Sequence, residues 1–175
     1  MSIKKILIEP NKILREKSIN VENVDEEIQK LMDDMLETMY AASGIGLAAI
    51  QIGIPKRVIV MDISRDDKEK KPMYFVNPKI ISKENENSIY EEGCLSVPGQ
   101  FAKIQRPKHC KVIYLDYFGK EKILDAQGLL ATCIQHEFDH LEGILFIDYL
   151  SRLKKTMIIK KLSKQQYDNI DRIVV

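Results

Sequence analysis

Residues 135–143 read QHEFDHLEG and hold two of the three histidines in the chain. In a helix, residues four positions apart lie on the same face, so His136 and His140 would both point at one metal ion. Glu137 directly follows the first histidine and would reach a water molecule bound to that ion. This is the H-E-x-x-H arrangement of metal-assisted hydrolysis. In the alternative interpretation two buried histidines make core hydrogen bonds beside a surface glutamate, and the specific spacing makes that interpretation the weaker one.

The helix that carries this motif is expected to be buried. Its predicted span, residues 129–141, has apolar side chains on almost every face, and Gly143 is suited to end it in a left-handed conformation. A helix that is apolar all round lies in the interior of a protein. The two histidines should therefore lie in a shielded cleft, against a sheet.

The rest of the pattern predicts an α+β fold. Apolar residues at steps of three and four, starting near Asp25, predict an N-terminal amphipathic helix. Residues 151–167 should form a basic C-terminal helix, and residues 144–149 a short extended piece. Strands are expected at residues 57–63, 74–82, 89–91, 111–117 and 122–126. Because short turns and no helices join these strands, we expect antiparallel β-sheets packed around the central buried helix.

Length and composition limit the class of protein. The chain has 175 residues, 45% apolar and 30% charged, which favours one domain over residues 1–175, and the family resemblance given below implies that this domain is catalytic. Its net charge of +1 gives no reason to expect sequence-specific nucleic-acid binding, and no apolar run is long enough to cross a membrane. Three widely spaced cysteines favour a reducing compartment over a disulfide framework.

A catalytic zinc-type site needs a third protein ligand and an open position for water. His109 lies in a charged stretch and is expected to be exposed. Cys94 is the better candidate, because Gly93 beside it frees the backbone for a close approach. Cys133 is expected to be a small buried hydrophobe. Gln51 is the one amide in an apolar run, and a structural and a functional role are equally open for it.

Three segments together resemble the peptide deformylase family. They read GIGLAAIQ at residues 44–51, EGCLS at 92–96 and QHEFDHL at 135–141, and their order and spacing also fit the family. H-E-x-x-H alone is shared by many peptidases, whereas the three segments in this order are highly specific. The resemblance implies a hydrolase that removes the formyl group from the N-terminal formyl-methionine of newly made polypeptides and releases formate.

The resemblance also implies a set of site residues. Cys94, His136 and His140 would hold one divalent metal ion, Fe²⁺ in the cell, with Zn²⁺, Ni²⁺ or Co²⁺ possible in preparations. Glu137 would act as general base and then as general acid. The Gln51 side-chain amide and the Leu95 backbone N–H would stabilise the oxyanion. The expected substrate-binding residues are Ile45, Gly46, Gly93, Leu129, Thr132 and Cys133, and Phe101 is expected at the rim.

The expected partners are N-formylmethionyl nascent peptides in a bacterial cytoplasm. The basic residues of the last helix favour a solvated face, with docking to the ribosome as the minority interpretation. Two other functions would need features that the sequence lacks. An H-E-x-x-H peptidase that cuts internal bonds would need a further ligand after His140, and none follows. A metal-stabilised ribosome-binding module would need a closed four-ligand site, and only three ligands are evident.

Overall fold

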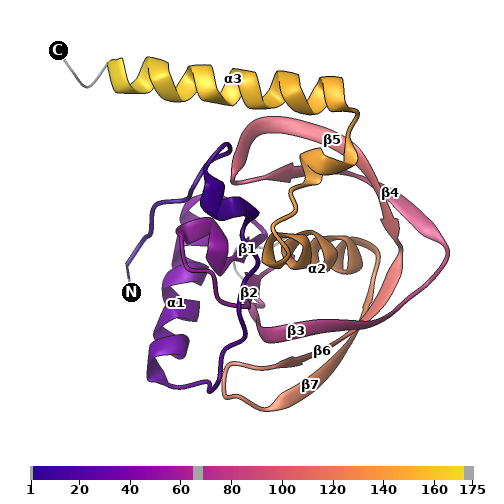
Figure 1. Cartoon of the computed structure of the whole chain (residues 1–175). Helices are drawn as coiled ribbons and strands as arrows, with labels where there is room; N and C mark the ends of the chain where they lie inside the picture. The colour runs from indigo at the N-terminus through magenta and orange to yellow at the C-terminus, as the bar shows by residue number, and fades with distance from the viewer. Residues whose placement is uncertain (1, 65–68, 172–175) are drawn as a thin grey trace.

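The computed structural model describes residues 2–64 and 69–171 and has a mixed α+β fold (Figure 1). One sheet has five strands in the order β1-β2-β3-β6-β7, and a second sheet is the pair β4-β5. Neighbouring strands are antiparallel throughout. The strands are β1 (Gly46–Ala48), β2 (Val58–Met61), β3 (Met73–Lys83), β4 (Asn87–Cys94), β5 (Val97–Pro107), β6 (His109–Leu115) and β7 (Glu121–Gln127). The expected α+β class with antiparallel sheets is confirmed.

Helix α2 (Gly128–Leu141) begins directly after β7 and contacts strands of both sheets. Figure 1 shows it near the centre of the molecule, with strands curving around it. Ala131, Ile134 and Leu141 pack in a buried cluster with side chains of β2, β3 and β6. Gly143, with φ 73°, follows the end of the helix. This placement puts the H-E-x-x-H segment between the two sheets.

Helix α1 (Glu26–Ala41) covers the other face of the five-stranded sheet. Its N-cap is Asp25, whose carboxylate accepts a hydrogen bond from the Ile28 backbone N–H at 3.0 Å. Along β2, Val58 and Val60 pack with α1, whereas Ile59 and Met61 pack with α2. Alternate residues of a strand point to opposite faces, so β2 is buried between the two helices.

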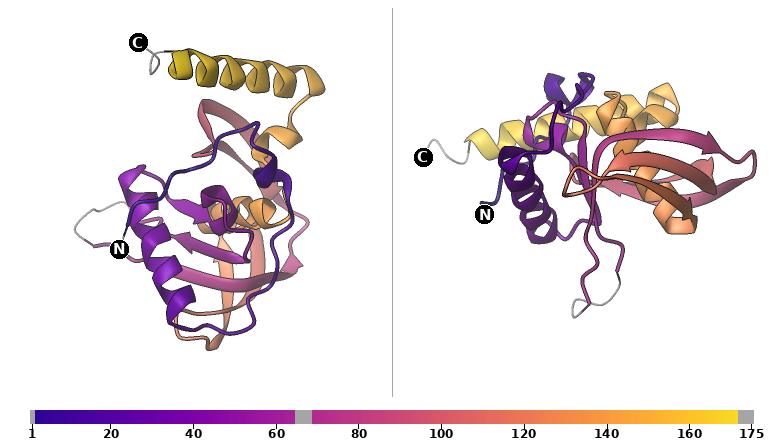
Figure 2. Two further views of the ribbon diagram at one scale, coloured as in Figure 1. Left: turned by 60° about the vertical axis from the view of Figure 1, so that its left-hand side comes forward. Right: turned by 90° about the horizontal axis from the view of Figure 1, so that it is seen from below.

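Helix α3 (Arg152–Asp171) runs along one side of the molecule, beside β5 (Figures 1 and 2). Leu162 anchors it in a third buried cluster with Val97 and Phe146, and Ile158 packs against that cluster. Leu153 and Met157 are exposed. Among the described residues, no helix is both long and apolar enough to span a bilayer.

Four points of the sequence-based prediction need correction. Residues 144–149 are not extended, because Phe146–Tyr149 form a 3₁₀ helix, η3, in which the Asp148 carboxylate accepts a hydrogen bond from the Leu145 N–H at 2.8 Å. Strand β5 was not predicted, and β4 is longer than expected. His109 is only half-exposed in β6, where it pairs with Glu84 and Asp125 rather than lying in an open loop.

Candidate active site

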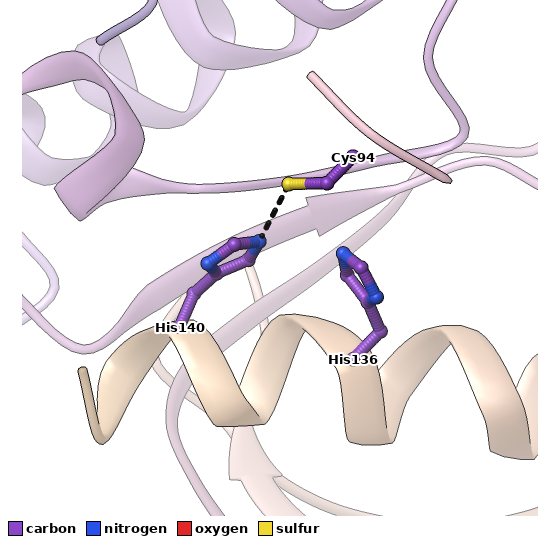
Figure 3. A group of neighbouring side chains, drawn as sticks. All are labelled: Cys94, His136 and His140. Carbon is purple, nitrogen blue, oxygen red and sulfur yellow. Dashed lines mark hydrogen bonds between the residues drawn. The ribbon is translucent and has the colours of Figure 1, made fainter. Parts of the chain in front are cut away.

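Three side chains of types that bind metal ions meet between β4 and α2. Cys94 ends β4, and His136 and His140 rise from one face of α2 (Figure 3). Their donor atoms all lie within 4.8 Å of one another, and the Cys94 Sγ is 3.3 Å from the His140 Nε2. The strand register shifts between Gly93 and Cys94, where the hairpin closes onto the helix. Among the described residues, no other group of this kind forms.

The donors fit a divalent transition metal. One sulfur and two imidazole nitrogens suit Fe²⁺ or Zn²⁺, and three protein ligands leave a coordination position open. Both histidines are buried, and burial, together with the nearby His136, holds the pKa of His140 well below its usual range. A neutral imidazole is the form that binds metal.

A buried ion pair fixes the orientation of His136. The Glu92 Oε2 lies 2.8 Å from the His136 Nδ1, so the ring donates there and leaves Nε2 facing Cys94 and His140. Arg106 donates to both Glu92 oxygens, at 2.6 and 3.0 Å. Burial alone would raise the pKa of Glu92, but the hydrogen bonds from His136 and Arg106 lower it overall. Glu92 therefore remains a carboxylate that holds the imidazole.

Glu137 is buried beside Gly46, and one of its carboxylate oxygens, Oε2, has no hydrogen-bond partner within the described structure. A Cβ at position 46 would lie 2.3 Å from the Glu137 Oε1, so only glycine leaves room for this side chain. Burial raises the pKa of Glu137 to about 7. The carboxyl group is thus placed to exchange a proton near neutrality.

Gln51 is 1% exposed and lies in the 3₁₀ helix η2 (Ala49–Ile52). Its Oε1 accepts a hydrogen bond from the Ala48 N–H at 2.8 Å, and its Nε2 donates to the Ser96 Oγ at 3.1 Å. The same nitrogen is 3.6 Å from the Cys94 Sγ. These contacts hold the amide with its N–H groups toward Ser96 and Cys94.

A cavity of about 470 Å³ opens beside these groups. The residues that line it include Gln51, Cys94, Leu95, His136 and Glu137. All six residues that are expected to bind substrate line it as well. Those six are Ile45, Gly46, Gly93, Leu129, Thr132 and Cys133. Tyr90 and Phe101 also line it. The Phe101 ring lies over Gly93, where an added Cβ would be 2.6 Å from the ring.

Sequence reasoning left several neighbours of the site without a role. Glu92 belongs to the E-G-C-L-S segment, two residues before Cys94, and this closeness was the only signal for it. Arg106 lies in the unpredicted strand β5, and Ser96 had no role beyond membership of the same segment. His109, judged not to be a ligand, lies outside the metal-ligating group.

A helix-borne H-E-x-x-H pair that meets a cysteine beside a cavity defines the class of metal-dependent hydrolases. Residues 3–156 match the model of the polypeptide deformylase family. The chain is 69% identical to a peptide deformylase of Pelagibacter ubique over 170 residues, covering 97% of this chain and 99% of the relative. It is 54% identical to that of Rhizobium meliloti, covering 94% of each.

Solved structures agree with this assignment. The crystal structure of peptide deformylase from Ehrlichia chaffeensis superposes with a TM-score of 0.92 at 44% identity, covering 97% of this chain and 99% of that one. The same enzyme in complex with actinonin gives 0.89 at 47% identity, covering 94% and 98%. The chain belongs to the polypeptide deformylase family.

Proposed function

We propose that the cluster of Cys94, His136 and His140, with Glu137 and Gln51, carries out deformylation in this chain. The activity itself follows from the family: this is a hydrolase that removes the N-terminal formyl group from newly synthesised polypeptides. The observation that carries the assignment of residues is the convergence of the three ligands beside a buried carboxyl group, at the wall of one cavity.

The three ligands would hold one divalent ion, with Fe²⁺ proposed for the cell and Zn²⁺, Ni²⁺ or Co²⁺ compatible with the same donors. When bound, such an ion acidifies water and polarises the formyl carbonyl. Glu92 and Arg106 hold His136 in the orientation that binding requires.

Glu137 moves the protons. Its carboxylate takes a proton from the attacking water, and the resulting acid returns that proton to the leaving amine of methionine. The contact with Gly46 keeps the carboxyl group at the cavity wall, and the apolar surroundings keep bulk water away from it.

Gln51 and Leu95 stabilise the negative charge that develops on the formyl oxygen. The Gln51 amide is already oriented by Ala48 and Ser96, so little reorganisation is needed when charge appears. Leu95 lies between Cys94 and Ser96 at the cavity, and we assign its backbone N–H as the second donor.

The formyl-methionine side chain would enter the apolar part of the cavity, between Ile45, Leu129 and Cys133. Thr132 lines the same part. The substrate backbone would pair with the segments at Gly46 and Gly93, as an added strand.

We further propose that residues 1–175 form one catalytic domain that works in the bacterial cytoplasm. The three cysteines are free, which suits a reducing compartment. Helix α3 carries a basic surface and two exposed apolar side chains, Leu153 and Met157. Docking of α3 to the ribosome remains the proposed minor alternative to a solvated face.

Turnover of formyl-Met-Ala-Ser by protein purified without oxygen and loaded with Fe²⁺ tests this function. We expect release of formate with the remaining peptide intact, and loss of that release after chelation, restored by added Fe²⁺. Cleavage of an internal bond without formate would instead favour an ordinary H-E-x-x-H peptidase. Formate release that survives complete metal removal would contradict the proposed site.

A further inference from the structure

A chain of hydrogen-bonded polar groups continues from Glu92 away from the cavity. Arg106 donates to Glu92 with two nitrogens, and with a third it donates to the Asp139 Oδ2 at 2.8 Å. The Tyr149 hydroxyl donates to the same Asp139 oxygen, also at 2.8 Å. The Arg106 guanidinium lies over the Tyr149 ring, with its Cζ atom 5.0 Å from the ring centroid.

These groups come from four different elements: Glu92 from β4, Arg106 from β5, Asp139 from α2 and Tyr149 from η3. The Arg106 side chain is only 5% exposed, so its charge depends on these partners for compensation. Tyr149 is 51% exposed. The chain of hydrogen bonds therefore connects His136 to a residue at the protein surface, beyond every residue that lines the cavity.

We infer that Tyr149 is a positioning residue for the metal centre, acting through Asp139, Arg106 and Glu92 on the orientation of His136. This inference rests on the proposed function only in taking His136 as a ligand. The Tyr149 hydroxyl holds the half-buried Asp139 carboxylate against Arg106, and Arg106 in turn holds Glu92. Without the hydroxyl, Asp139 is free to turn toward solvent, Arg106 loses its fixed partner, and Glu92 holds the imidazole less rigidly.

Tyr149→Phe tests the inference, because it keeps the ring over Arg106 and removes only the donor to Asp139. The measured quantity is the affinity for Co²⁺ or Zn²⁺, from competition with a chelator, together with the visible absorption of the Co²⁺ form. Mutation of a residue that hydrogen-bonds a metal ligand weakens metal affinity by about 10- to 100-fold. Tyr149 lies further along the chain of hydrogen bonds, so we expect its loss to weaken metal affinity by roughly three- to tenfold. The absorption bands of the Co²⁺ form should shift as well.

Tyr117→Phe is the matched control. Its hydroxyl also donates to a carboxylate, Asp33 at 3.2 Å, but in another part of the molecule, and metal affinity should not change. A second arm repeats Tyr149→Phe in a Glu92→Gln background. In that background the connection to His136 is already weakened. Tyr149→Phe should therefore lower metal affinity by no more than about twofold.

Unchanged affinity and spectrum in a folded Tyr149→Phe protein would overturn the inference. An equal loss in the Glu92→Gln background would also overturn it, because that result would mean a general structural effect. Failure of the proposed function would appear elsewhere, as absence of formate release by the parent protein with metal affinity intact.

Discussion

Gly46 and Glu137 are in direct contact, so that a Cβ on residue 46 would lie 2.3 Å from the Glu137 Oε1. The clash would be with the end of a flexible side chain and not with backbone. Gly46→Ala should therefore fold and keep its metal ligands, while the Glu137 carboxyl group moves. Displacement of a catalytic group by about 1 Å costs on the order of 10²-fold in rate, and we expect a fall in kcat of that size. Thermal unfolding and metal content, measured beside kcat, should stay near the parent values, and a parent-like kcat would contradict the assigned position of Glu137.

Gln51 should affect turnover more than substrate binding. Loss of one oxyanion donor lowers turnover by about 10²–10³-fold, and we expect this for Gln51→Ala with little change in KM. Because the Gln51 Oε1 also accepts from the Ala48 N–H, Gln51→Glu keeps that contact and serves as the control for local structure. It should restore stability but not kcat. Recovery of kcat by Gln51→Glu would assign Gln51 a purely structural role.

Cys94 should be required for metal binding in a way that the other cysteines are not. Cys94→Ala removes one of three ligands, so the purified protein should hold well under one equivalent of metal. Cys110→Ala is the matched control, since Cys110 is a buried core residue of β6. A full equivalent of metal in Cys94→Ala, measured by elemental analysis, would remove this residue from the ligand set.

Asp62 should make stability depend on pH in acid. The buried carboxylate accepts hydrogen bonds from Tyr40, Ser64 and Lys71, which lower its pKa although burial opposes them. Its folded pKa thus lies below its unfolded pKa, and its contribution to stability is present above the unfolded value and lost as pH falls through the folded one. Asp62→Asn should therefore melt below the parent at pH 7, and the difference should shrink below about pH 4. A difference in Tm that is constant down to pH 2 would contradict this reading.

Local periodicity was enough to predict the helices and most of the five-stranded sheet. The spacing of His136 and His140 places both side chains on one helix face whatever the tertiary fold, which is why the centre of the site was evident from the sequence. Strand β5 was missed because its residue types do not follow its alternating burial: the apolar Phe101 is exposed and the charged Arg106 is buried. Residues 144–149 were wrongly expected to be extended because the capping contact of Asp148 leaves no periodic signal.

Contacts between distant segments could not be predicted from periodicity. Cys94 lies 42 residues before His136, and spacing gives no link between them. Gly93 made Cys94 the better candidate, and the resemblance to a family then implied its role as a ligand. Arg106 and Tyr149 belong to no motif, and they meet only because β5 and η3 pack on the same side of α2. That Arg106 is buried, and so needs its charge compensated, becomes evident only when the positions of its partners in the fold are known.

Glu137→Gln tests whether Glu137 moves the protons of the reaction. The change keeps the size of the side chain and its contact with Gly46 but removes the proton-accepting carboxylate. Proteins with equal metal content should be compared for formate release from formyl-Met-Ala-Ser, with Glu142→Gln as control, since Glu142 pairs with Arg57 away from the cavity. We predict a fall in kcat of about 10²–10⁴-fold for Glu137→Gln and none for Glu142→Gln. Formate release by Glu137→Gln at the parent rate would contradict the role of Glu137 in proton transfer.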